Sequence, residues 1–114
     1  MFDNGSRYVS RGINDEIPID VQIFMWQLIE ELKDTIEDID YLQVFTISTV
    51  DESENTIRII HSQEVPEYKK IWIFKASEPC NEEKIFVIDD GSHSTMLLAD
   101  EYWWSKLFNL FQIK

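Results

Sequence analysis

The sequence predicts an α+β domain in which an antiparallel sheet packs against two amphipathic helices. The first observation is a helical apolar stripe between residues 18 and 37. The second is a series of β-branched and aromatic segments between residues 41 and 98, and the third is an aromatic stripe over about 100–112. Strands joined by short polar turns form antiparallel meanders, so we expect a meander sheet of five or six strands. The chain length fits one domain, 1–114, with residues 1–6 frayed.

The N-terminal part is expected to contain one short strand and the first helix. Residues 7–11 favour the strand, and Pro18 opens the helix because proline suits the first helical position. Most apolar residues of this helix fall within an arc of about 140°. Ile23 and Trp26 project outside the arc.

Five further segments have the composition of strands, namely residues 41–50, 56–62, 70–75, 84–89 and 95–98. Segments 70–75 and 84–89 are apolar on both faces. We therefore expect the first helix to cover one face of the sheet and the C-terminal helix to cover all or part of the other. The turn after 84–89 is centred on either Asp90-Gly91 or Gly91-Ser92, and the second choice places Asp90 opposite His93.

The charge is unevenly distributed along the chain. The formal net charge is −12, yet residues 15–54 hold twelve acids and one base, and the rest of the chain is close to neutral. This acidic segment is either a solvated surface or a surface that docks on a basic partner. The acidity argues against duplex DNA and anionic membrane as direct partners, since both require cationic surface.

The composition also bounds the compartment and the chemistry. Cys80 is the single cysteine, so no intrachain disulfide forms, and we expect a cytoplasmic protein without a signal peptide or membrane span. Three glycines leave no nucleotide-binding loop and no nucleophile elbow. The sequence names no reaction, and we assign no catalytic residue, metal or cofactor.

Two polar clusters contain both histidines of the chain. One includes His61, Glu64 and Tyr68, and the other includes Asp89, Asp90 and His93. If the two clusters met, they could bind a divalent metal or act in general acid–base catalysis. Their spacing is diagnostic of neither, and turn formation or hydrogen bonding explains the same residues.

A candidate interface arises because two helices cannot cover the whole of such a sheet. Ile23, Trp26, Trp103 and Trp104 are the residues expected to remain partly exposed, as an interface for a protein partner or a homodimer. Ordinary core packing is the alternative.

A candidate anion contact comes from Arg7 and Arg11, which share a face of the N-terminal strand. They are expected either to pair with the acidic helix or to bind phosphate or carboxylate.

Five runs of the sequence resemble a known family. The runs are RYVSRG at 7–12, IP at 17–18, FMW at 24–26, HSQEVPEY at 61–68 and IDDGSHSTMLL at 88–98. Together they resemble a family of small proteins of unknown function that was first described from staphylococci and occurs in Firmicutes and their mobile elements. The resemblance implies a cytoplasmic bacterial protein and carries no activity.

Taken together, these observations lead us to expect a non-enzymatic domain that binds a protein or a ligand. One alternative, which the link to mobile elements favours, is an acidic nucleic-acid mimic that inhibits a basic protein. The other is an enzyme or metal protein that uses the two histidine clusters.

Overall fold

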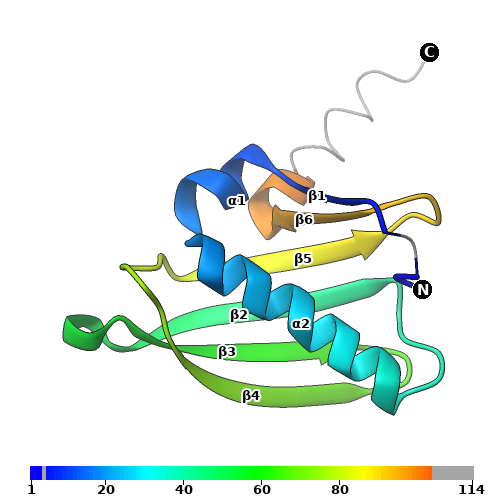
Figure 1. Ribbon diagram of the computed structural model, residues 1–114, viewed down its shortest axis with the longest axis horizontal. Coiled ribbons are helices and arrows are strands. Elements are labelled where there is room, and N and C mark those ends of the chain that lie inside the picture. Colours follow the sequence, from blue (N-terminus) through cyan, green and yellow to red (C-terminus); the bar gives the residue numbers. More distant parts are fainter. Residues whose placement is uncertain (4, 104–114) are drawn as a thin grey trace.

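The computed structural model describes residues 1–3 and 5–103, which form a six-stranded sheet with one long helix across a face (Figure 1). The strand order is β1-β6-β5-β2-β3-β4. The elements are β1 (Arg7–Val9), α1 (Arg11–Glu16), α2 (Ile19–Thr35), β2 (Leu42–Asp51), β3 (Thr56–Gln63), β4 (Tyr68–Lys75), β5 (Glu83–Asp89) and β6 (Ser94–Leu98), with a 3₁₀ turn at Glu52–Glu54. The α+β class and six strands agree with the sequence prediction.

The sheet is mixed, so the prediction of a purely antiparallel meander is wrong. β2, β3 and β4 do form consecutive hairpins, but β5 returns to pair with the free edge of β2. The connection over residues 76–82 can make this return, since crossing three strand spacings requires about 15 Å and seven residues span up to about 23 Å. β1 then pairs in parallel with β6, the last strand of the chain.

The first helical region differs from the prediction, because a short helix precedes the long one. The expected strand at residues 7–11 ends at Val9, and α1 begins at Arg11. Ser10 caps α1, since its side chain accepts a hydrogen bond from the Ile13 N–H at 3.2 Å. The predicted long helix over 18–37 corresponds to α2, which is shorter by a residue or two at each end.

One residue of the N-terminal segment, Phe2, belongs to the core. Phe2 is buried at 4% exposure, and its backbone N–H donates to the Asp89 carboxylate. The Lys33 ammonium donates to the Phe2 carbonyl at 2.7 Å. The Phe2 backbone is thus held between the end of β5 and α2.

The core lies between α2 and one face of the sheet. Alternate residues of the central strands, such as Phe45, Ile59 and Ile85, are fully buried there. Phe24 of α2 stacks on Phe74 of β4 with ring centroids 4.6 Å apart. We call the sheet face turned away from α2 the open face.

The C-terminal helix begins on the open face. Residues 99–103 are helical, and Tyr102 contacts Phe86 of β5 edge to face at 5.4 Å. The described part of this helix thus contacts the open face at Phe86 of β5. The remainder of the expected helix, including Trp104, lies outside the described residues. Within residues 1–3 and 5–103, no helix has the length and apolar character needed to cross a membrane.

Candidate functional surface

His61 lies inside the core rather than in a pocket. It is 1% exposed, stacks on Phe45 at 4.4 Å and contacts Tyr68 edge to face at 5.4 Å. Its Nε2 lies 2.7 Å from Gln43 Oε1, which only accepts hydrogen bonds, so Nε2 carries the proton. Burial lowers the pKa of His61 to about 4, and the ring is therefore neutral at physiological pH.

The Gln43 amide extends this contact into a closed network of buried hydrogen bonds. Gln43 Nε2 donates to Gln63 Oε1 at 2.7 Å and to the Asp40 carbonyl at 2.9 Å. Gln63 in turn donates to the Pro66 carbonyl. Glu64 is exposed, and none of these hydrogen bonds reaches its side chain. The first polar cluster therefore joins the end of β3 to the loops beside it and has a structural role.

The second cluster is a hairpin turn. Asp90 lies opposite His93, and the Asp90 N–H donates to the His93 carbonyl at 3.0 Å, which confirms the alternative centred on Gly91-Ser92. Asp90 Oδ1 accepts from the backbone N–H groups of Ser92 and His93. Gly91 adopts φ 98°, as the first central position of such a turn requires.

Serine, histidine and aspartate are neighbours in this turn, but their arrangement serves the turn. The Ser92 hydroxyl lies 3.0 Å from His93 Nδ1, and His93 Nε2 lies 3.3 Å from Asp90 Oδ2. The same aspartate holds the two turn amides, and Asp90 and Ser92 are exposed. The His93 ring packs edge to face on the exposed Tyr8 at 5.1 Å. The hydrogen bonds of the turn therefore account for these contacts.

The two clusters do not meet. His61 belongs to β3 and His93 follows β5, with β2 between these strands, and the contacts described above link neither histidine to the other cluster. Asp89 accepts from the backbone N–H groups of Phe2 and Gly91. The described part of the chain contains no group of three side chains able to hold a metal ion. The shared site required by the enzyme or metal alternative is therefore absent from it.

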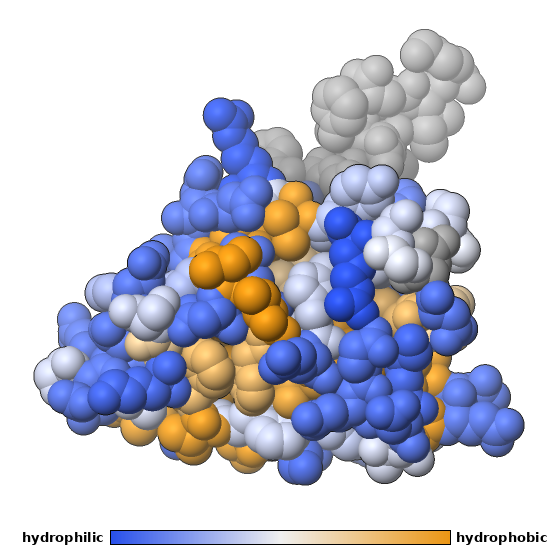
Figure 2. All heavy atoms as spheres, in the orientation of Figure 1, coloured by the Kyte–Doolittle hydropathy of each residue, from blue (hydrophilic) through white to orange (hydrophobic). Residues whose placement is uncertain are grey.

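The predicted interface residues divide into exposed and buried ones. Ile23 is 50% exposed and Trp103 is 58% exposed, as expected. Trp26 is 9% exposed, so its predicted exposure is wrong. The Arg7 guanidinium covers it at 4.8 Å from the ring centroid and pairs with Glu30. Figure 2 views the α2 side, where a small hydrophobic group lies within a largely hydrophilic surface.

Arg7 and Arg11 do not share a strand face, contrary to what the sequence predicted. Arg11 opens α1 and is exposed, whereas Arg7 lies in β1 and faces α2. Arg7 adopts the pairing with the acidic helix that was one of the two expected outcomes.

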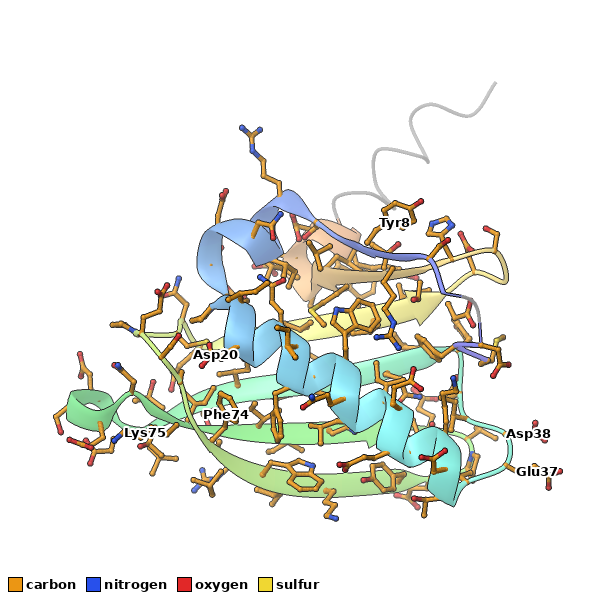
Figure 3. The ribbon with its side chains drawn as sticks, in the orientation of Figure 1. Tyr8, Asp20, Glu37, Asp38, Phe74 and Lys75 are labelled. Atoms are coloured by element: carbon orange, nitrogen blue, oxygen red, sulfur yellow. The ribbon has the colours of Figure 1, made fainter. Side chains whose placement is uncertain are left out.

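The acidic segment is spread over the molecule. Figure 3 places Glu37 and Asp38 at one end and Lys75 at the other, where Lys75 pairs with Glu54 at 2.9 Å. The ten residues of β2 separate these ends by about 30 Å. Asp20 is also engaged, since it accepts from the Ser77 N–H at 2.8 Å. This distribution favours a solvated acidic surface over one row of phosphate-like carboxylates.

A cavity of about 410 Å³ lies beside the β2–β3 turn. Its lining includes Asp51, Glu52, Glu82 and the single cysteine, Cys80. Burial, with Asp20 and Glu83 nearby, raises the pKa of the Cys80 thiol to about 11. The thiol is therefore protonated at neutral pH and is a poor nucleophile.

The open face is the feature that the sequence interpretation missed. Its charged strand residues are the cations Arg58, Lys69, Lys75 and Lys84 and one acid, Asp51, which lies opposite Thr56 at the end of β2. Ile71 and Ile73 of β4 are 55% and 60% exposed there. In the register, Ile71 lies opposite Ile60 and Ile73 lies opposite Arg58. A protein of net charge −12 thus carries one face that is apolar and cationic.

Comparison with known proteins agrees with the fold and adds no activity. The family model described as "Staphylococcal protein of unknown function (DUF960)" matches residues 6–101. A crystal structure of a protein of unknown function from Enterococcus faecalis is similar, with 25% sequence identity and a TM-score of 0.68 over 84% of this chain and 89% of that chain. Among curated proteins nothing matches. The resemblance predicted from the sequence runs is confirmed.

Proposed function

This chain belongs to the DUF960 family of staphylococcal proteins of unknown function, and we propose that it is a protein-binding domain. The binding surface is the part of the open face over β3 and β4, and the partner is a protein that presents acidic and apolar side chains. The observation that carries the proposal is the segregation of charge, since the open-face positions of β3 and β4 hold three cations, Arg58, Lys69 and Lys75, and no acid.

Apolar burial and charge complementarity support this choice of partner. Ile71 and Ile73 are more than half exposed, and completing their burial contributes about 2 kcal/mol. Arg58 and Lys69 form no ion pair with any described residue, so both are available to carboxylates of a partner. Charges at the rim of an interface chiefly set specificity and association rate.

Nucleic acid and membrane fit the surface less well. Single-stranded nucleic acid requires aromatic side chains for base stacking, but the exposed apolar residues over β3 and β4 are isoleucines. An anionic membrane would be repelled by the net charge of −12.

The first step of the test traps the partner. A photo-reactive phenylalanine analogue replaces Ile71 in the full chain, inside the cells that express it. Gln27, which is exposed on α2 at the opposite side of the sheet, provides the control position. We expect one protein to be trapped from Ile71 and not from Gln27. Equal trapping from both positions, or none from Ile71, contradicts the proposal.

The second step measures the affinity of the identified and purified partner. Arg58→Glu and Arg11→Glu change the net charge equally, but only Arg58 lies on the open face. We expect Arg58→Glu to weaken binding by about tenfold or more and Arg11→Glu to leave it unchanged. Equal losses in both variants would mean that the partner responds to net charge and not to this surface.

A further inference from the structure

We propose that the partner binds as an additional β-strand along β4, through an extended acidic segment. The inference rests on the proposed function, because it assigns a mode of recognition to the same end of the sheet. It adds the class of ligand, which is a peptide segment whose acids and apolar residues match the register of β4.

The first argument is that β4 is a long, regular edge. It is the last strand of the order, and all eight of its residues pair with β3 without a register shift. Alternate backbone N–H and C=O groups of an edge strand point away from the sheet and can accept a further strand. The opposite edge, β1, has only three residues. Strand addition at an exposed edge is a common mode of peptide recognition.

The second argument is the charge of this edge. β4 contains Lys69, Lys70 and Lys75 and no acid, so it carries +3 while the rest of the chain carries −15. The Lys70 ammonium lies 4.2 Å from the Trp72 ring centroid, and Lys75 pairs with Glu54. Lysines on an edge discourage pairing with an identical strand. They favour a strand that places carboxylates opposite them.

The third argument concerns the side chains between the lysines. Ile71 and Ile73 lie on the open face, whereas Trp72 and Phe74 face α2 and are half-buried. In an antiparallel added strand, residues directly opposite one another share a face. A peptide that places valines opposite the two isoleucines, glutamates opposite the three lysines and threonines opposite Trp72 and Phe74 has the sequence Glu-Thr-Val-Thr-Val-Glu-Glu.

An added strand would give the β4 side chains new cross-strand neighbours. Each β4 residue then has a neighbour on both sides, as residues of a central strand do. The exposed isoleucines gain cross-strand contacts, and Lys69, which has no ion pair among the described residues, gains a carboxylate. The peptide completes an edge that the described chain leaves open.

The experiment uses the full chain labelled with ¹⁵N and an acetylated, amidated peptide of that order. The charge-inverted peptide Lys-Thr-Val-Thr-Val-Lys-Lys is the control. Amide hydrogen exchange is measured residue by residue, with the acidic peptide at about 90% occupancy. We expect alternate β4 amides, those with the N–H directed outward, to exchange about tenfold more slowly. The basic peptide leaves them unchanged.

Three outcomes contradict the inference, and the first of them is still compatible with the proposed function. If the acidic peptide shifts the Ile71 and Ile73 methyl signals without protecting β4 amides, the peptide binds the face and strand addition fails. If both peptides protect β4 equally, the edge does not select acids. If protection increases with protein concentration alone, the occupant is a second copy of this chain.

Discussion

The burial of His61 makes a quantitative prediction about the pH dependence of stability. The ring is 1% exposed, packs against Phe45 and Tyr68, and holds its proton on the nitrogen that faces Gln43. Adding a second proton would place a charge in an apolar environment. Burial therefore lowers the pKa of His61 to about 4, against 6.5 for an exposed histidine.

The sign and size of the effect follow from linkage. Between these two pKa values the unfolded state binds a proton that the folded state does not, so stability falls as the pH falls. The contribution of this group is complete above about pH 6.5, and the two pKa values predict a loss of about 1.4 kcal/mol by pH 5.5 and about 2.5 kcal/mol by pH 4.5. Well below pH 4 both states are protonated, and no further loss occurs.

The assay compares urea unfolding of the wild type and His61→Gln at several pH values between 7.5 and 4.5. Glutamine keeps a donor near Gln43 and does not titrate, so His61→Gln lacks this pH-dependent loss. The difference between the two proteins therefore isolates His61 from all other titrating groups. Parallel stability curves, or a His61 ring that titrates above pH 6 in the NMR spectrum of the folded protein, would refute the reasoning.

Two further predictions concern α1 and the carboxylates next to it. A Cβ at Gly12 would lie 2.7 Å from the Glu101 carboxyl group, which accepts from the Gly12 N–H, so Gly12→Ala lowers the free energy of unfolding by about 1–3 kcal/mol. Gly5→Ala, with open space around the added methyl, is the control for urea denaturation. The hydrogen bond to Glu16 raises the pKa of Glu83 to about 7, so the stability from this group is present below about pH 4.5 and is lost as the pH rises through 7. We therefore expect the difference in free energy of unfolding between Glu83→Gln and the wild type to favour the variant more at pH 8 than at pH 5. An equal difference at both pH values would contradict the pairing of Glu83 with Glu16.

The strands and their turns could be predicted because their signals are local. The composition of residues 56–62 gives β3, and its two-residue period places Ile57, Ile59 and His61 on one face. All three are buried. The same alternation therefore indicates that His61 is a core residue. It had become a site candidate only because an imidazole can bind a metal or transfer a proton.

The parallel strand could not be predicted, because its pairing joins distant parts of the chain. Arg7 lies beside Ser94, and no local pattern specifies that contact. The contact also accounts for the error at Trp26, which lies outside the apolar arc of α2 but is covered by Arg7 of β1. A helical arc predicts burial against the sheet, and it does not account for a side chain that reaches the helix from a neighbouring strand.

The net charge obscures the arrangement that matters for binding. Averaged over the chain, −12 suggests an acidic surface that seeks a basic partner. When the strand register separates the residues by face, Lys69 and Arg58 lie together with Ile71 and Ile73, and the acids of α2 lie on the other side of the sheet. The expected charge of the partner therefore changes from positive to negative, because a partner that docks on β3 and β4 meets cations. We therefore expect such a partner to be acidic where it contacts Lys69 and Arg58.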